Sequence, residues 1–202
     1  MAGGWSALER SLRTAGASHI AGVDEVGRGP LAGPVVVCAV IMPADRRAIP
    51  GVTDSKQLKA AERARLAAQI RGEAVAVSLA AASVAEIARW NIYQATARAM
   101  ARAIQRLPVP PDEVLVDGKP IKTLGVPHHA VVGGDAQCYS IGCASIVAKV
   151  VRDRLMQRLA VRHPGYGWES NAGYGTPAHL AGLRAHGLTP HHRVAFCRTA
   201  LS

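Results

Sequence analysis

The stretch HIAGVDEVGRGPLAGPVVVCAVIM, residues 19–42, decides the fold of this chain. Residues 19–28 and 34–42 predict two β-strands, and the Gly- and Pro-rich segment GRGPLAG between them predicts the turn that joins them. The second strand segment is apolar throughout, which is typical of a strand covered on both of its faces. We therefore expect a sheet with other elements packed on either side.

The segments that follow alternate between helix and strand patterns. The expected elements are a helix at 59–71, a strand at 74–81, a helix at 83–107, strands at 113–117 and 129–133, and helices at 140–160 and 178–186. Ser83 and Glu86 have the spacing of a capping box at the start of the long helix. Strands that come first and then alternate with helices indicate an α/β domain with a mixed central sheet.

Length and composition exclude several classes of protein. The chain has 202 residues, of which 49% are hydrophobic and 19% charged, and this predicts a single globular domain over 1–202. The longest apolar run, Val35–Met42, is far shorter than the roughly 18–20 residues that cross a bilayer. The N-terminus has no apolar block before a small-residue cleavage site. We therefore expect a cytoplasmic monomer that is neither membrane-spanning, secreted nor fibrous.

The charge of the chain indicates the kind of partner. Lys and Arg number 24 and Asp and Glu 14, so the formal net charge is +10. Such a field attracts polyanions and favours nucleic acid as the partner. The alternative is a generally basic composition in which the charge only aids solubility. The four cysteines have no C-x-x-C spacing, which favours reduced thiols over metal ligands or disulfides.

Four acidic residues lie where predicted strands end, and they are Asp24, Glu25, Asp117 and Asp135. Sites of α/β proteins form at such strand ends. Clustered carboxylates repel one another unless a cation neutralises them, and ligation by oxygen alone selects Mg²⁺ or Mn²⁺. Asp117 and Asp135 also stand beside glycines, so the alternative for each is an ordinary turn residue.

Neighbouring side chains of a regular strand point to opposite faces, so Asp24 and Glu25 converge only if the strand bends or ends there. The segment Gly27-Arg28-Gly29 permits a bend, and glycines on both sides of Arg28 let the backbone touch a sugar or a phosphate. The alternative is a tight turn without a ligand. A carboxylate-held metal site in a cationic protein suits cleavage of a phosphodiester, with two ions roughly 3.5–4 Å apart.

Six motifs, in the family's order, resemble ribonuclease HII. They are DEVGRGPLAGP (24–34), TDSKQL (53–58), EVLVDG (113–118), GDA (134–136), ASIVAKVVRDRLM (144–156) and GYGTPAHL (173–180). The resemblance runs from about residue 19 to about residue 196. It implies an RNase H-like fold with a mixed five-stranded sheet flanked by helices. The catalytic core would span about 17–160 and a helical C-terminal extension about 161–202.

The resemblance also implies an activity, namely metal-dependent endonucleolytic cleavage of the RNA strand of RNA–DNA hybrids and of single ribonucleotides embedded in duplex DNA. The cut would fall on the 5′ side of the ribonucleotide and leave a 3′-hydroxyl and a 5′-phosphate, as ribonucleotide removal and primer processing require. Two Mg²⁺ or Mn²⁺ ions are expected with substrate bound. The alternatives are a hybrid-binding module without catalysis, against which the four carboxylates argue, and a phosphotransferase, for which a nucleotide-cradling loop is missing.

Site residues follow from motif position. The residues that match the family's metal-binding carboxylates are Asp24, Glu25, Asp117 and Asp135. Those that match the readers of the ribose at an RNA-to-DNA junction are Gly27, Arg28, Gly29 and Tyr174. Those that match other contacts to nucleic acid are Ser55, Lys56, Asn91, Lys149 and Arg152. Lys149 and Arg152 are three apart, so both are expected on one helix face toward phosphates. Asp153 is the rival of Asp135, although its place beside Arg152 favours a structural ion pair.

Three features depart from the family pattern. Gly133 stands where Lys is frequent, so a positive contact near the site is expected to be missing. Tyr139, with Cys138 and Cys143, replaces a run of small residues and is expected to alter packing or redox sensitivity. No clamp-binding peptide follows Arg198. The numerous histidines of the tail are expected on the surface, where the HHR segment at 191–193 is a further candidate phosphate contact.

Overall fold

The computed structural model describes residues 4–201. Its sheet consists of β1 (Ile20–Val26), β2 (Val35–Ile41), β3 (Ala76–Ala82), β4 (Glu113–Asp117) and β5 (His129–Val131), in the order β3-β2-β1-β4-β5. β1 is antiparallel to β2 and β2 to β3, whereas β4 is parallel to β1 and β5 to β4. The expected mixed five-stranded sheet is therefore confirmed.

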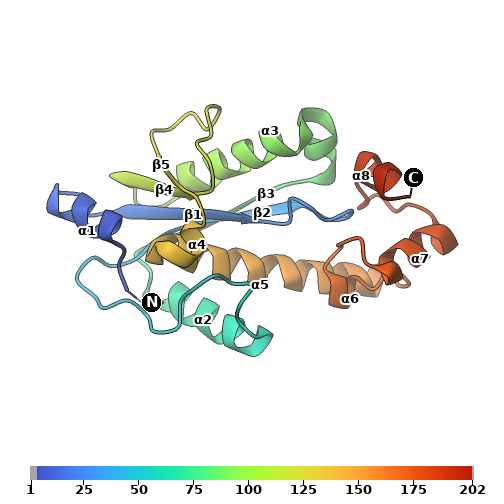
Figure 1. Cartoon of the computed structure of the whole chain (residues 1–202), viewed down its shortest axis with the longest axis horizontal. Coiled ribbons are helices and arrows are strands. Elements are labelled where there is room, and N and C mark those ends of the chain that lie inside the picture. Colours follow the sequence, from blue (N-terminus) through green and yellow to red (C-terminus); the bar gives the residue numbers. More distant parts are fainter. Residues whose placement is uncertain (1–3, 202) are drawn as a thin grey trace.

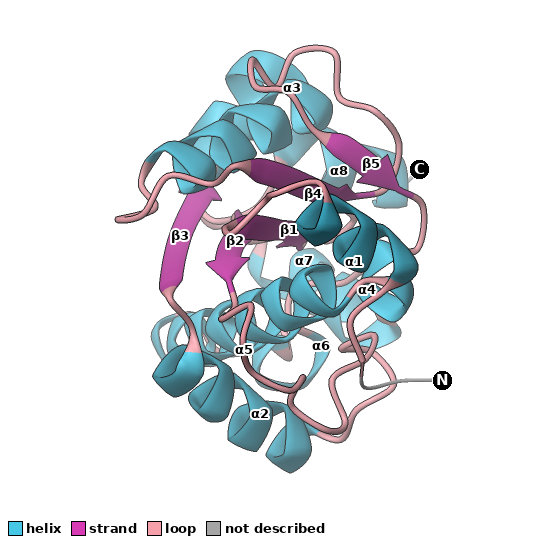
Figure 2. Ribbon diagram, turned by 90° about the vertical axis from the view of Figure 1, so that its left-hand side faces the viewer, coloured by secondary structure: helices cyan, strands magenta, loops and turns pink. Residues whose placement is uncertain are grey.

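Helices cover both faces of the sheet (Figure 2). α3 (Val84–Gln105) packs on one face, and α5 (Tyr139–Arg162) with α2 (Ala60–Glu73) on the other. Every residue of β2 is buried, because its alternate side chains enter the two apolar cores. The other helices are α1 (Ala7–Thr14), α4 (Gly134–Gln137), α6 (Trp168–Asn171), α7 (Pro177–His186) and α8 (Val194–Leu201). No helix within residues 4–201 has the length and apolar character that a bilayer crossing needs.

The C-terminal helices α6, α7 and α8 gather at the end of the sheet toward which β1 runs (Figure 1). They enclose a separate apolar cluster that contains Tyr166, Trp168 and Leu183. The end of α5 contributes Met156 to this cluster, and the turn between β1 and β2 contributes Leu31. The Gly-rich turn is thus packed into the C-terminal part of the chain as well as joined to the sheet.

Two expected elements differ in their boundaries. The helix expected over 83–107 is interrupted at Asn91, whose φ of 63° is left-handed and whose Oδ1 accepts a hydrogen bond from the Gln94 N–H at 3.0 Å. A residue other than glycine rarely adopts a φ in this range, and the Asn91 side chain caps the helix that follows. The strand expected over 129–133 ends at Val131, because Gly133 turns the chain with a φ of 67°. Asp135 consequently lies in α4 instead of directly after a strand.

The expectation of surface histidines is wrong for His179 and His192, which are both buried. Their Nε2 atoms are 3.0 Å apart, and the Trp168 Nε1–H donates to His179 Nε2 at 3.0 Å. Burial lowers the pKa of His179, and burial together with the neighbouring His179 lowers the pKa of His192 to about 4. This pair is therefore held neutral inside the C-terminal cluster and does not face phosphate.

The four cysteines, Cys38, Cys138, Cys143 and Cys197, are buried free thiols. Burial raises the pKa of every one of them, which keeps the thiols protonated. The neighbouring departure, Tyr139, is also buried, and its hydroxyl accepts a hydrogen bond from the Ile49 N–H at 3.0 Å. Cys38, Tyr139 and Cys143 fill the core between α5 and the sheet, whereas Cys197 lies in the C-terminal cluster.

Glu9 attaches α1 to the start of α5. Its side chain is fully buried. One carboxylate oxygen accepts from the Ser140 N–H at 2.8 Å and from the Ser140 hydroxyl at 2.7 Å, and the other accepts from the Tyr139 N–H at 3.1 Å. The first N–H groups of a helix have no partner within the helix and carry partial positive charge. Glu9 supplies both the acceptors and the negative charge.

We expect Glu9→Gln to lower the free energy of unfolding by about 2–4 kcal/mol, because an amide removes the charge and turns a donor toward N–H groups. Urea denaturation followed by circular dichroism measures the change. Glu62→Gln is the matched control, since Glu62 pairs with Arg65 on the exposed face of α2, and its unfolding midpoint should hardly move. Equal midpoints for the two variants would contradict the role given to Glu9.

Candidate active site

Two parallel strands bring three carboxylates to one edge of the sheet. Val23 of β1 lies opposite Val116 of β4, so Asp24 and Asp117 come next on adjacent strands, and Glu25 follows Asp24. The carboxyl ends of parallel strands are where such sheets open into a crevice. Asp24 is buried, whereas Glu25 and Asp117 are half-buried. The strand register alone therefore places these side chains at the same end of the sheet.

The electrostatics of Asp24 indicate that the carboxylates lie close together. Burial raises the pKa of Asp24 well above its usual range, and the negative charges of Glu25 and Asp117 raise it further. Hydrogen bonds with the Ser145 side chain and with the Glu25 N–H, which is 2.7 Å from Asp24 Oδ1, act in the opposite direction. Removing these like charges from water without a cation is costly, so the cluster favours a positive occupant.

Asp135 joins the other carboxylates from α4. Asp117 Oδ1 accepts a hydrogen bond from the Gly134 N–H at 2.7 Å, which ties the first turn of α4 to the end of β4. Burial raises the pKa of Asp135, the charge of Asp117 adds to the shift, and Lys56 opposes it. Gly134 permits this approach, since a Cβ there would lie 2.6 Å from Ile141 Cδ1. All four carboxylates expected from the sequence therefore meet in one region.

Asp24 and Glu25 can belong to one site although neighbouring side chains of a strand point to opposite faces. Two cavities of about 400 Å³ each flank the end of β1. Asp24 lines the cavity on the α5 side, Asp117 lines the cavity on the α3 side, and Glu25 lines both. β1 ends at Val26, and Gly27 turns the chain with a φ of 95°. Glu25 can therefore stand at the boundary although Asp24 points to the other face.

Cationic side chains surround this carboxylate cluster. Arg28 and Lys119 line the α3-side cavity, and Lys56, Arg63 and Lys149 line the α5-side cavity. Arg28 Nη1 lies 3.3 Å from a Glu25 oxygen, and Lys56 Nζ lies 3.5 Å from an Asp135 oxygen. Among residues 4–201 no three His, Cys, Asp or Glu side chains form a ready-made metal-binding group. Two of the four carboxylates are instead balanced by cations of the chain itself.

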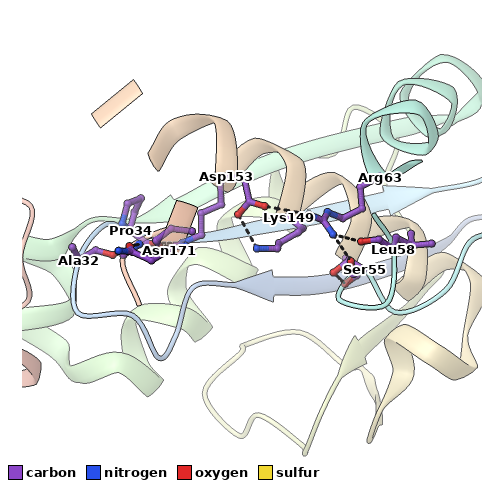
Figure 3. Close-up of polar contacts among 12 residues, drawn as sticks. Ala32, Pro34, Ser55, Leu58, Arg63, Lys149, Asp153 and Asn171 are labelled. Carbon is purple, nitrogen blue, oxygen red and sulfur yellow. Dashed lines mark hydrogen bonds and ion pairs between the residues drawn. The ribbon is translucent and has the colours of Figure 1, made fainter. Parts of the chain in front are cut away.

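Asp153, the rival for the fourth carboxylate, is engaged in ion pairs on α5. Lys149 Nζ is 2.8 Å from Asp153 Oδ1, and Arg63 Nη2 is 3.8 Å from Asp153 Oδ2 (Figure 3). Arg63 also donates to the backbone carbonyls of Ser55 and Leu58. Asp153 therefore fixes two cations and, through Arg63, the loop that carries Ser55 and Lys56. Asp153 thus forms the structural ion pairs, and Asp135 stays the predicted fourth carboxylate.

The expectation that Arg152 faces phosphate beside Lys149 is wrong, because its side chain is fully buried. Its Nε donates to the Pro34 carbonyl at 3.0 Å and its Nη2 to the Ala32 carbonyl at 3.1 Å, both labelled in Figure 3. Its Nη1 donates to the Ala172 carbonyl at 2.9 Å. The spacing of three residues places Lys149 and Arg152 on neighbouring parts of α5, but the turn after β1 covers the second of them.

Ser55 and Asn91 occupy different surroundings. Ser55 lines the α5-side cavity and is buried, and its hydroxyl oxygen lies 3.0 Å from that of Ser145, within hydrogen-bond distance. Ser145, which also bonds Asp24, was not expected from the sequence, because a serine in an Ala-rich helix gives no sign of its neighbours. Asn91 is exposed at the break in α3 and lines neither cavity. Its contact with nucleic acid stays a prediction.

Tyr174 shares the α5-side cavity with two of the carboxylates. The residue is 44% exposed, and it lines that cavity together with Asp24 and Glu25. A Cβ built on Gly29 would lie 3.8 Å from Tyr174 Cε1, an ordinary contact distance. The Tyr174 carbonyl is held by His179 Nδ1 at 2.9 Å. The structure thus brings the Gly27–Gly29 segment and Tyr174 together from opposite ends of the chain.

Comparison with known proteins agrees with this fold. The family model for Ribonuclease HII matches residues 21–199. Ribonuclease HII of Thermosynechococcus vestitus is 55% identical over 194 residues, which is 96% of this chain and 90% of that protein. The crystal structure of ribonuclease H2 from Pyrococcus horikoshii OT3 has a TM-score of 0.78 at 26% identity and covers 91% of this chain and 97% of that one. The crystal structure of Bst-RNase HIII in complex with Mn²⁺ shares the fold, with a TM-score of 0.67 at 21% identity over 94% of this chain and 71% of that one.

The mixed sheet, its carboxylate-bearing edge and these matches define an endonuclease of the ribonuclease H type. The expected RNase H-like fold with a helical C-terminal extension is confirmed. The chain belongs to the ribonuclease HII family. Its activity is accordingly endonucleolytic cleavage of RNA in RNA–DNA hybrids.

Proposed function

We propose that the chain cleaves a nucleic-acid strand on the 5′ side of a ribonucleotide, and that this reaction depends on a metal ion. Its substrates would include a single ribonucleotide embedded in duplex DNA. The products would be a 3′-hydroxyl and a 5′-phosphate, as ribonucleotide removal and primer processing require. The observation that carries this proposal is the meeting of Asp24, Glu25, Asp117 and Asp135 in a region lined with cations. The cytoplasmic location, the monomeric state and the lack of a clamp-binding peptide stay predictions.

The chemistry of the donor groups fits a hard divalent cation. The four side chains that would hold it offer only carboxylate oxygens, which suit Mg²⁺ and Mn²⁺, and two such ions are expected with the substrate. Mutual repulsion of Asp24, Glu25 and Asp117 is the feature that a cation relieves. When bound, the ions supply polarisation of the phosphate and a water of lowered pKa. The Mn²⁺ complex of Bst-RNase HIII, a protein of the same fold, is in keeping with this choice.

The cationic residues of the chain orient the nucleic acid. Lys119 and Arg28 on one side and Lys56 and Lys149 on the other line the two cavities, so they can meet phosphates on both sides of the carboxylates. Asp153 limits the positions that Lys149 can take. The strand to be cut is thereby drawn toward a region whose centre is negative and whose borders are positive.

Gly27, Arg28 and Gly29 with Tyr174 are proposed to read the sugars at the junction. A backbone flanked by glycines can approach the 2′-hydroxyl, the group that distinguishes RNA from DNA at one position. The aromatic ring of Tyr174 would pack against the next sugar, where a deoxyribose fits better than a ribose. Gly27 cannot be replaced easily, because a Cβ there would lie 2.0 Å from Arg152 Nε.

The direct test is cleavage of a DNA duplex that carries one ribonucleotide, with Mg²⁺, with Mn²⁺ and with EDTA. We expect nicking on the 5′ side of the ribonucleotide with either metal and none with EDTA, because the carboxylates alone cannot activate water. End-labelled products on a sequencing gel report the position and the end groups. Tight, metal-independent binding of an uncut duplex would favour a hybrid-binding module instead.

Tyr174→Ala is expected to reduce the preference for an RNA-to-DNA junction more than it reduces the affinity for nucleic acid. The kcat/KM for a single-ribonucleotide duplex, divided by that for an all-RNA strand paired with DNA, should fall by about tenfold, since aromatic contacts to a nucleotide contribute about 1–3 kcal/mol. Leu188→Ala is the control, because Leu188 is similarly exposed but lines neither cavity. A parent enzyme that cuts both substrates equally would contradict the role of Tyr174.

A further inference from the structure

Within residues 4–201, two arginines are buried without an ion pair to a carboxylate, and both are bound to backbone carbonyls. Arg193 is 3% exposed and Arg152 is fully buried. Arg193 donates through Nε and Nη2 to the Gly33 carbonyl at 3.0 and 2.7 Å, through Nη1 to the Arg28 carbonyl at 2.7 Å, and through Nη2 to the Gly27 carbonyl at 2.6 Å. Every one of these acceptors lies in the turn between β1 and β2.

Burying such a charge is costly, so its hydrogen bonds must compensate for the lost hydration. Burial lowers the pKa of Arg193 to about 10, and the nearby charge of Arg152 contributes to the shift. Hydrogen bonds from a charged donor to carbonyls are stronger than those between neutral groups. A guanidinium also presents its donors in a rigid fork, which fixes the relative positions of several carbonyls at once.

The contacts of Arg193 determine which way the peptide groups of the turn face. The carbonyls of Gly27 and Arg28 point at Arg193. In a trans peptide the next residue's N–H points away from the carbonyl, and residues 4–201 contain no cis peptide bond. The N–H groups of Arg28 and Gly29 therefore point away from Arg193. No group in the described part of the chain accepts a hydrogen bond from either of them.

The same region joins the turn to Tyr174. The Arg193 N–H donates to the Leu31 carbonyl at 2.7 Å, and the Leu31 N–H donates to the Gly173 carbonyl at 2.9 Å. The two segments are in close contact, because a Cβ on Gly173 would lie 2.6 Å from the Ala32 carbonyl oxygen. Arg193, the turn and the residue before Tyr174 thus form one continuous hydrogen-bonded unit.

We infer that Arg193 is a positioning residue that presents the Arg28 and Gly29 N–H groups to a ribose 2′-hydroxyl and sets their distance from Tyr174. This inference rests on the proposed reading of a single ribonucleotide. Arg193 itself does not contact the nucleic acid, because its donors are occupied by the carbonyls of the turn. It therefore controls the preference for ribose over deoxyribose and not the general attraction to a duplex.

The test compares Arg193→Lys with the parent enzyme in metal-free buffer with EDTA. Fluorescence anisotropy gives the Kd for a duplex with one ribonucleotide and for the all-DNA duplex of the same sequence. We expect the ratio of the two Kd values to fall by about tenfold in the variant, because an ammonium cannot hold three carbonyls in the fork geometry, while the Kd for the all-DNA duplex stays within about twofold. Arg198→Lys, an exposed arginine of α8, is the control and should keep the parent ratio.

If Arg193 had only a structural role, the variant would bind both duplexes more weakly and melt at a lower temperature, but the ratio of the two Kd values would not change. This outcome would overturn the inference. Arg193→Gln is the second variant, since it removes the buried charge and keeps an amide donor, so it can fold where lysine does not. A parent enzyme that binds and cuts the single-ribonucleotide duplex, with both variants keeping the parent ratio, would refute the positioning role alone. A parent that does not cut that duplex would refute the proposed function.

Discussion

Asp24→Asn is expected to reduce cleavage of a single-ribonucleotide duplex by at least about a thousandfold, since loss of metal-assisted stabilisation removes several kcal/mol from the transition state. Asp24 is the most deeply buried of the four carboxylates, and the negative charges of Glu25 and Asp117 raise its pKa further. The amide keeps the shape of the side chain and relieves this repulsion. The fold should therefore be retained while the group that would hold the ions is lost.

Single-turnover cleavage with Mg²⁺ or Mn²⁺ measures the loss, and anisotropy with the uncut duplex checks that binding is retained. Asp112→Asn is the control, because Asp112 precedes the opposite end of β4 and accepts hydrogen bonds from the Ser18 and His19 N–H groups. It should cut at nearly the parent rate. Near-parent cleavage by Asp24→Asn would remove the carboxylate cluster from the mechanism.

Gly22→Ala is expected to lower the free energy of unfolding by about 3 kcal/mol, at the upper end of the cost of overpacking a core. Gly22 lies in the middle of β1, directly beneath the first turn of α5. A Cβ there would lie 2.1 Å from the Ser140 carbonyl carbon and 2.4 Å from the Ile141 nitrogen. These neighbours are backbone atoms of a buried helix, so neither element can move aside without disturbing the other.

Urea denaturation followed by circular dichroism measures this effect. Gly72→Ala is the matched control, since Gly72 lies in the last turn of α2 and a Cβ there would meet nothing within 4 Å. Alanine in place of a helical glycine should raise the free energy of unfolding by about 0.5–1 kcal/mol. If the two Gly→Ala variants change the free energy of unfolding in opposite directions, the close approach of α5, and not the loss of glycine itself, determines the destabilisation. Two changes of equal size would refute the packing argument.

Local patterns predicted the regular elements of this fold well. The strand expected at 113–117 coincides with β4, and Ser83 with Glu86 forms the capping box at the start of α3. The same Ser-x-x-Glu pattern at Ser6 and Glu9 marks α1, which was not expected, so the signal was available in the sequence. Elements with strong local signals can thus be found without knowledge of the fold.

Contacts between distant segments could not be predicted from spacing. Arg152 and Lys149 share a helix as expected, but whether an arginine faces solvent or a buried carbonyl depends on a turn more than 100 residues away in the chain. Arg193 presents the same difficulty, because the HHR segment looks like an exposed basic cluster. The convergence of Asp117 and Asp135 could be expected from the family resemblance, whereas the hydrogen bond between Asp117 and Gly134 could not.

The four buried thiols offer separate reporters of motion within the molecule. Cys197 lies in the apolar cluster of α6, α7 and α8, whereas Cys38 and Cys143 lie between the sheet and α5. A bulky alkylating reagent reaches each sulfur only when its own cluster opens, so the order of modification ranks the stability of the clusters. Mass spectrometry of briefly alkylated protein would thus reveal whether the part that carries Tyr174 loosens while the core beside the carboxylate cluster stays closed.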